Sequence, residues 1–359
     1  MSISTSFPVI IAIVASLAAY AGCEPNNNSH VSFDSKNTEP RSSIEPHANH
    51  PGNTPTTPGR LVAAKKPFTK DAFGEIPART SQTILIGSFN IQTFGPSKMN
   101  DRWVMERLAD VIRMFDVVAI QEIRSLDQTL LPVLMSYVNS SGSRYEFVIG
   151  PRLGRTDSKE QYAYIFDAKR IASGINATYT LNDDIDVLHR EPLIGRFVVR
   201  SNLTNRPWTF SLVNLHTDPD EAIQEVNSMG GIMREIRNWE FTSAQEDDCI
   251  LLGDLNAAPR KMEALQSIGG VYPLIANQPT NVRETELYDN ILIEPGFTSE
   301  YTQRSGVLSL RNLFGLASND ALKISDHNPV WAEFSIEEVD NRETQNDRQI
   351  ATQPNYSPR

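Results

Sequence analysis

The sequence predicts an α+β protein in which layers of β-sheet are covered by helices. Short apolar runs of about four to eight residues recur between residues 83 and 337, as strands do. Few helical patterns separate them, and the clearest one, at residues 101–115, has its apolar side chains on one face. Many strands with few helices between them favour stacked sheets flanked by helices.

The predicted elements follow one another along this region. Short apolar runs predict strands at residues 84–90, 117–121, 145–149, 162–166, 193–200, 208–215, 249–253, 289–293 and 330–334. Helical periodicity predicts helices at residues 101–115, 127–139 and 220–239. We expect the last helix to be interrupted at Gly230-Gly231, because glycine destabilises a helix interior.

The composition limits the classes of protein to consider. Of the 359 residues, 40% are hydrophobic, which suffices for a sizeable core in one large domain or two ordinary ones. The formal net charge of -11 and a pI of about 5.1 argue against a broad basic surface that holds nucleic acid. A nuclease whose bound metal ions offset an acidic site is compatible with this charge.

The start of the chain has the features of an export signal. Residues 7–21 are apolar or small, a run too short to span a bilayer, which needs about 20 apolar residues. Ala21-Gly22-Cys23 resembles a bacterial lipoprotein cleavage site, which would make Cys23 an acylated membrane anchor, although residues 1–6 contain no Lys or Arg. We therefore expect an exported protein that is periplasmic, lipid-anchored at the outer surface or secreted.

Four segments are expected. They are an export signal at residues 1–22, a disordered polar tether at 23–81, a folded domain at 82–337 and a disordered polar tail at 338–359. The two cysteines do not suggest a disulfide framework, and Cys249 lies in an apolar run where a buried thiol is expected.

An acid and an imidazole stand side by side at Asp326-His327, just before the predicted strand 330–334. The carboxylate can bind a hard cation, and the imidazole can transfer a proton near neutral pH. Metal-assisted hydrolysis requires both functions. An isolated Asp-His pair is more often a hydrogen-bonded loop pair, so the interpretation depends on other stretches.

Polar residues also follow other predicted strands, where a sheet holds side chains rigidly. Each alone is compatible with a turn or a solvated charge, but their recurrence favours one shared site. These residues are Asn90, Glu122, His216, Asp254, Asn256 and Asp289. Of the histidines in the folded domain, His189, His216 and His327, two belong to this set.

Together these stretches resemble the endonuclease/exonuclease/phosphatase superfamily, and within it the deoxyribonuclease I branch. The resemblance covers essentially all of residues 84–334. The motifs Gly253-Asp254-Leu255-Asn256 and Ser325-Asp326-His327 are shared across the superfamily, whereas residues 89–95 and Lys159-Glu160 are more specific to the branch. The other matching stretches are Gln121-Glu122-Ile123-Arg124, Arg190-Glu191-Pro192, Leu215-His216 and Tyr288-Asp289.

The resemblance implies a four-layered α/β/β/α sandwich of two packed, mostly antiparallel sheets flanked by helices, with the site at the top of the sheets. It implies two catalytic pairs, His216 with Glu160 and His327 with Asp289. In each pair the carboxylate would orient the imidazole and stabilise its charged form.

The resemblance also implies a site for Mg²⁺ or Mn²⁺, with Ca²⁺ as a structural or co-activating ion. Glu122 would be the principal ligand with Asn90 close by, and further metal and phosphate contacts would come from Asp254, Asn256 and Asp326. Arg124 and Arg190 match positions that contact the nucleic-acid backbone, since a planar guanidinium suits phosphate oxygens.

The sequence departs from the branch in several places. Ser158 and Gln92 stand where the branch has a DNA-contacting tyrosine and arginine, and Pro259 and Glu286 stand at about the places of its long-range disulfide. A calcium loop is one interpretation of the acidic residues that precede the strand 193–200, and an acidic surface turn is the other. These acidic residues are Asp183, Asp184, Asp186 and Glu191.

The leading hypothesis is an exported, metal-dependent, monomeric endonuclease that hydrolyses DNA with little sequence preference and leaves 5′-phosphate ends. The second is a phosphodiesterase or phosphatase of the same superfamily that acts on a lipid or phosphoinositide, as a sphingomyelinase does. The third is a non-catalytic binding domain, which predicts the loss of at least one catalytic group.

Overall fold

The computed structural model describes residues 76–155, 159–183 and 186–339. The expected export signal, Cys23, and nearly all of the expected tether and tail lie outside these residues. Among the helices of the described part, none has both the length and the apolar character to cross a membrane.

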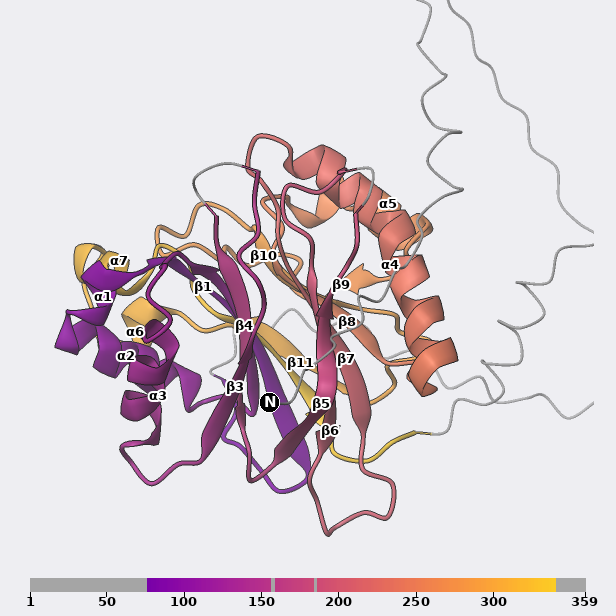
Figure 1. Ribbon diagram of the computed structural model, residues 1–359, viewed down its shortest axis with the longest axis horizontal. Coiled ribbons are helices and arrows are strands. Elements are labelled where there is room, and N and C mark those ends of the chain that lie inside the picture. The colour runs from indigo at the N-terminus through magenta and orange to yellow at the C-terminus, as the bar shows by residue number, and fades with distance from the viewer. Residues whose placement is uncertain (1–75, 156–158, 184–185, 340–359) are drawn as a thin grey trace, which may run out of the picture. The chain divides into compact units, whose positions relative to one another are not determined.

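Two six-stranded sheets form the centre of the fold (Figure 1). The strand order in the first sheet is β11-β12-β1-β2-β4-β3, and in the second it is β5-β6-β7-β8-β10-β9. The strands of the first sheet are β1 (Thr83–Phe94), β2 (Val117–Ile123), β3 (Tyr145–Ile149), β4 (Gln161–Asp167), β11 (Tyr301–Val307) and β12 (Val330–Ser335). Those of the second are β5 (Ile171–Thr180), β6 (Leu193–Val199), β7 (Thr209–His216), β8 (Cys249–Asp254), β9 (Tyr272–Pro273) and β10 (Asp289–Ile293).

Helices cover the outer face of each sheet (Figure 1). The helices beside the first sheet are α1 (Pro96–Met99), α2 (Arg102–Ile112), α3 (Leu130–Asn139), α6 (Leu310–Phe314) and α7 (Ser318–Ile324). Those beside the second are α4 (Ala222–Ala244) and α5 (Glu263–Ser267). Helix α2 begins at Asp101, whose carboxylate accepts hydrogen bonds from the backbone N–H groups of Trp103 and Val104 and so satisfies two donors that the helix itself leaves free.

Three apolar clusters hold the layers together. The middle cluster contains side chains of both sheets, such as Ile86 of β1 and Phe210 of β7. The neighbouring residue in β1, Leu85, packs in the cluster under α2 and α3, because successive side chains of a strand point to opposite faces. The third cluster joins β7 and β8 to α4 and α5. Burial on both faces explains why the central strands are apolar almost throughout.

The predicted fold class is therefore confirmed: two packed sheets lie between helices. Within each sheet one pair of strands is parallel, β1 with β2 and β7 with β8, and the other pairs are antiparallel. The predicted interruption of the long helix is wrong, because α4 continues through Gly230 and Gly231. Gly230 allows α5 to approach closely: a Cβ there would lie 2.5 Å from the carbonyl oxygen of Ala264.

The two parallel pairs bring their carboxyl ends to one end of the sandwich. Asn90 of β1 lies opposite Gln121 of β2, and His216 of β7 lies opposite Asp254 of β8. Asp254 in turn pairs with Asp289, the first residue of the antiparallel strand β10. The register of these strands therefore collects polar side chains at one place.

Candidate active site

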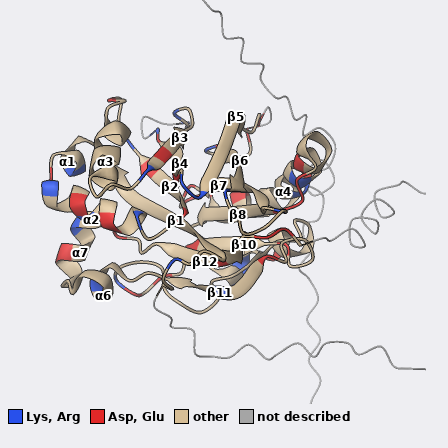
Figure 2. Cartoon of the chain, turned by 90° about the horizontal axis from the view of Figure 1, so that it is seen from below, with Lys and Arg blue, Asp and Glu red and all other residues tan. Residues whose placement is uncertain are grey.

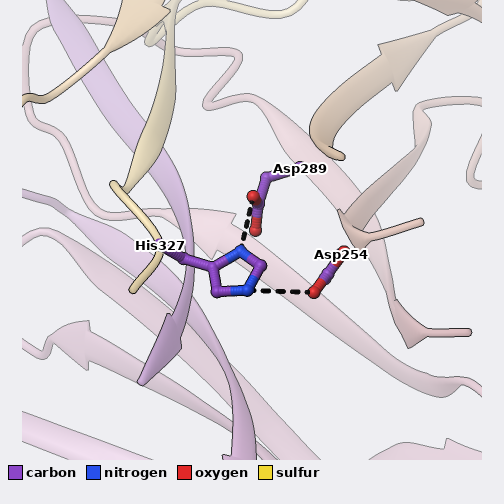
Figure 3. A group of neighbouring side chains, drawn as sticks. All are labelled: Asp254, Asp289 and His327. Carbon is purple, nitrogen blue, oxygen red and sulfur yellow. Dashed lines mark hydrogen bonds and ion pairs between the residues drawn. The ribbon is translucent and has the colours of Figure 1, made fainter. Parts of the chain in front are cut away.

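His327 lies between two aspartates (Figure 3). It stands in the loop between α7 and β12, where its backbone N–H donates to Ser325 Oγ at 3.0 Å. Its Nδ1 lies 2.8 Å from Asp289 Oδ2, and its Nε2 lies 3.5 Å from Asp254 Oδ2. Because β8 and β10 place the two aspartates directly opposite each other, the strand register fixes both carboxylates beside the ring.

His216 ends β7 and pairs with a different carboxylate. Its Nδ1 lies 2.7 Å from Oε1 of Glu160, whose side chain is fully buried just before β4. The hydroxyl of Tyr162 bonds to the backbone N–H and C=O of His216, and Arg190 Nε donates to the same carbonyl at 3.0 Å. These contacts fix the backbone of His216 while Glu160 fixes its ring.

One carboxylate oxygen joins the two pairs. Oδ2 of Asp254 lies 3.6 Å from Nε2 of His216 and 3.5 Å from Nε2 of His327. The amide nitrogen of Asn90 donates to this same oxygen at 3.0 Å and to Glu122 Oε1 at 3.1 Å. Asn90 thus bridges Asp254 and Glu122, so both histidine–carboxylate pairs and Glu122 form a single polar cluster.

Glu122 sits where the chain leaves β2 in an unusual backbone conformation. Its φ is +61°, in the left-handed region. Its Oε2 accepts a hydrogen bond from the backbone N–H of Thr93 at 2.8 Å and lies 3.2 Å from Arg124 Nε. Burial acts to raise the pKa of Glu122, but His216, Arg124 and these hydrogen bonds outweigh it, so the pKa is lowered and the carboxylate stays charged.

The carboxylates of the site raise the pKa of both histidines. Burial lowers the pKa of each imidazole, but the facing carboxylates outweigh burial and raise it: Glu160 does so for His216, and Asp289 together with Asp254 does so for His327. The two imidazolium charges in turn lower the pKa of Asp254 against the effect of its burial. Burial raises the pKa of Asp289 despite the attraction of His327. The site therefore holds proton donors and acceptors in direct contact.

Several oxygens of the cluster fit a divalent cation. Asp254, Asp289 and His327 each offer a ligand atom, and these three atoms lie within 4.8 Å of one another. Oδ1 of Asp289 and Oδ1 of Asp326 are buried and have no hydrogen-bond partner, which leaves them available to a hard cation. Glu122 adds a charged carboxylate beside Asp254.

The other predicted site residues lie around this cluster. The side-chain amide of Asn256 donates to the backbone carbonyl of Thr217 at 3.0 Å, and its backbone N–H donates to Asp254 Oδ1 at 3.1 Å. The guanidinium of Arg124, 30% exposed, contacts Glu122 and Glu160. Arg190 is only 3% exposed and lies 3.4 Å from Glu160, with one buried nitrogen, Nη2, that has no hydrogen-bond partner. The structure thus brings all the predicted residues together, and their individual roles stay predictions.

One further residue of the site, Lys98, could not be predicted from the sequence. Lys98 lies in the short helix α1, and its Nζ donates to the backbone carbonyls of Ile91, Gln92 and Ile324 at 2.6, 2.6 and 2.8 Å. Two of these carbonyls follow Asn90, and the third precedes the Ser-Asp-His motif. Lys98 therefore joins two of the chain segments that carry site residues. A single lysine after Gly95-Pro96 has no pattern that would predict this contact.

Other predictions have mixed outcomes. Cys249 is buried as expected. In the acidic stretch before β6, Asp183 accepts from the backbone N–H of Leu188, and Asp186 pairs with Arg155 at 3.0 Å. These contacts describe a turn held by an arginine, and the calcium loop stays a prediction. Asp184 and Ser158 lie outside the described residues.

The fold and the site define a class of protein in which two histidine–carboxylate pairs and additional carboxylates sit at one end of a β-sandwich. The sequence pattern of the Endonuclease/Exonuclease/phosphatase family matches residues 87–327. The chain therefore belongs to this family, as the resemblance implied. The family's name covers nucleases and phosphatases, which hydrolyse phosphate esters.

Relatives of known name are similar over most of the chain. Deoxyribonuclease gamma of Rattus norvegicus is 30% identical over 274 residues, which are 70% of this chain and 83% of that protein. Deoxyribonuclease-1 of Gallus gallus is 29% identical over 270 residues, 70% of this chain and 92% of that protein. A functionally unknown conserved protein from Enterococcus faecalis V583 has the same fold, with a TM-score of 0.51 and 18% identity over 71% of this chain and all of its own.

Proposed function

We propose that this protein is a metal-dependent endodeoxyribonuclease that hydrolyses the phosphodiester backbone of DNA with little sequence preference and leaves 5′-phosphate ends. One observation supports the proposal above all: two histidine–carboxylate pairs face one buried aspartate, Asp254, from two sides. The similarity to deoxyribonuclease gamma and deoxyribonuclease-1 favours DNA among the phosphate esters.

Each histidine–carboxylate pair carries out one of the two proton transfers of the reaction. Water attacks phosphorus in line, the bond from phosphorus to the 3′ oxygen breaks, and the phosphate stays on the 5′ oxygen. One imidazole, oriented by its carboxylate, accepts the proton of the attacking water, and the other donates a proton to the leaving 3′ oxygen. His216 with Glu160 and His327 with Asp289 supply these two groups.

Other side chains of the cluster hold the charges. When bound, Mg²⁺ or Mn²⁺ would stabilise the negative charge that develops on the phosphate oxygens, and Glu122, Asp254 and Asp326 are the residues that would hold it. Asn90 keeps Glu122 and Asp254 side by side. Arg124 presents a partly exposed guanidinium at the rim, which suits a backbone phosphate.

Because the protein carries a net negative charge, we expect it to contact DNA only at the active site. Figure 2 shows Lys and Arg interspersed with Asp and Glu along the helices and strands. With a formal charge of -11, attraction to the DNA phosphates has to come from residues such as Arg124 and from the bound metal ion. Contacts to phosphates carry no sequence information, which supports weak sequence preference.

We further propose export as a monomer, with Cys23 as an acylated membrane anchor. The support is the apolar run at residues 7–21 followed by Ala21-Gly22-Cys23. Fractionation of cells that express the full chain and its Cys23→Ala variant tests this proposal. Loss of the membrane-bound fraction in the variant is the expected result, and equal partitioning of both chains would contradict it.

A substrate panel tests the proposed activity. Purified protein is incubated with supercoiled plasmid in Mg²⁺, Mn²⁺, or Mg²⁺ with Ca²⁺, and in chelator, beside sphingomyelin and phosphoinositides. We expect nicked plasmid only when metal is present, and nicks whose 5′ ends accept label from polynucleotide kinase only after phosphatase treatment. Hydrolysis of a lipid without nicking of DNA would replace the proposal with the second hypothesis.

A further inference from the structure

A second group of carboxylates lies at the opposite end of β8 from the active site. Glu246, Asp247 and Asp248 directly precede β8, Glu300 directly precedes β11, and Glu338 follows β12. Asp248, Glu300 and Glu338 each offer an oxygen, and these three oxygens lie within 4.8 Å of one another. The same holds for Glu246, Asp247 and Asp248. Asp248 therefore belongs to both groups and lies at the centre of the cluster.

The two most buried members each have an oxygen without a hydrogen-bond partner. Asp248 is 1% exposed: its Oδ2 accepts a hydrogen bond from the indole N–H of Trp208 at 2.7 Å, but its Oδ1 has no partner. Glu300 is 2% exposed: its Oε1 accepts from the backbone N–H of Val339 at 2.6 Å, but its Oε2 has no partner. A buried carboxylate oxygen without a partner is costly, so each of these oxygens is suited to a ligand.

The charges of the cluster are only partly offset. Arg206 is a cation that attracts both Glu300 and Glu338. Ca²⁺ typically binds six to eight oxygens of this kind.

We propose that Asp248, Glu300 and Glu338, with Glu246 and Asp247 beside them, bind a divalent cation of the Ca²⁺ type. This cation site is separate from the active site. The ligands come from both sheets, since Asp248 precedes β8 of the second sheet, whereas Glu300 and Glu338 flank β11 and β12 of the first. A bound cation would cross-link the two sheets at the end where Trp208 also bonds to the backbone carbonyl of Ile336.

Binding of Ca²⁺ at this site would stabilise the folded state, and this effect would be independent of catalysis. A cation that binds only the folded chain stabilises it in proportion to the logarithm of its concentration. With a dissociation constant of about 0.1 mM, 10 mM Ca²⁺ would raise the Tm of a domain of this size by about 5–10 °C.

Two readouts on the full chain test the proposal without any substrate. The first is the Tm in chelator and in 10 mM CaCl₂. The second is the emission of bound Tb³⁺ on excitation of tryptophan at 295 nm, since the Trp208 indole touches Asp248. Wild type is compared with Asp248→Asn and Glu300→Gln, which keep the shape of each side chain, and with Asp326→Asn, which alters the active site instead.

We expect Ca²⁺ to raise the Tm of wild type and of Asp326→Asn. In Asp248→Asn and Glu300→Gln the Ca²⁺-dependent change in Tm should be less than half as large, and the Tb³⁺ emission should be reduced as well. Equal Ca²⁺ shifts and equal emission in all four proteins would overturn the proposal. If a buried variant does not fold, Glu338→Gln, at a partly exposed ligand, gives the same comparison. A wild type with no response to Ca²⁺ or Tb³⁺ would also overturn the proposal.

Discussion

His216 and His327 direct their Nε2 atoms at the same atom, Oδ2 of Asp254, from 3.6 and 3.5 Å. On the far side of each ring, Nδ1 is held by a different carboxylate, Glu160 or Asp289. The two imidazoles are therefore arranged alike around one point. Such an arrangement suits a reaction that removes a proton on one side of the substrate and supplies one on the other.

Replacing Glu160 with Gln should lower the pKa of His216. In the wild type burial lowers this pKa, but the charge of Glu160 outweighs burial and raises it. The stabilisation from the protonated pair is complete below the ordinary histidine pKa of about 6.5, and it is lost as pH rises through the higher folded value. Without that charge, the NMR titration of His216 in chelator should move to lower pH, and kcat/KM should fall about 10- to 100-fold.

Glu146→Gln is the matched control for Glu160→Gln. Glu146 lies in β3, its side chain is 55% exposed, and it pairs only loosely with Arg144 at 3.7 Å. The Glu146→Gln substitution should leave both the titration of His216 and the activity unchanged. An unchanged titration in Glu160→Gln would show that this pair does not set the charge of the ring.

Replacing Lys98 with Met should impair catalysis by loosening two segments of the site. The substitution removes the hydrogen bonds to the carbonyls of Ile91, Gln92 and Ile324, and the free energy of unfolding should fall by about 1–3 kcal/mol. Because Lys98 positions other residues, we expect kcat to fall about 10-fold or more and KM to change less. Lys323→Met, at an exposed lysine that pairs with Asp320, is the control, and equal kcat values in the two variants would contradict this role.

Glycine is required at position 253 but not at position 231. Gly253 has a φ of +145°, and a Cβ there would collide with the backbone of Leu215 in the neighbouring strand, so Gly253→Ala should lower the free energy of unfolding by more than about 3 kcal/mol. Gly231 lies in α4 with open space around it, so Gly231→Ala should raise that free energy by about 0.5–1 kcal/mol. Denaturant unfolding measures both changes. Equal stability of the two variants would show that strand packing at Gly253 tolerates a side chain.

Much of the fold could be predicted because its central strands are buried on both faces and therefore read as apolar runs. Strands β3 and β10 begin and end where the sequence predicted. Strand β11 was missed because its residues, Tyr-Thr-Gln-Arg-Ser-Gly-Val, are mostly polar and its pairing with β12 is irregular. The helix interruption at Gly230 was predicted wrongly because this glycine permits the close approach of α5, and that approach depends on tertiary packing.

The residues of the site could be predicted from the sequence, but their contacts could be predicted only in part. Asn90, Glu122 and Asp254 stand out because polar residues follow apolar runs. The sequence could not show that Asn90 donates to both Glu122 and Asp254, or that Glu122 adopts a positive φ, since both depend on how β1, β2 and β8 lie together. One of the three backbone contacts of Lys98 is to Ile324, which lies 226 residues further along the chain. No local sequence pattern could indicate such a contact.

The most direct test of the account is the nicking of supercoiled plasmid by His216→Ala, His327→Ala and His189→Ala beside the wild type. His189 is buried and lies 3.7 Å from Asp218, outside both histidine–carboxylate pairs. We predict that the first two variants lose at least about 100-fold in rate while His189→Ala stays within a few-fold of wild type. Folded His216→Ala or His327→Ala protein that nicks DNA at the wild-type rate would contradict the proposal that these two imidazoles carry out the reaction.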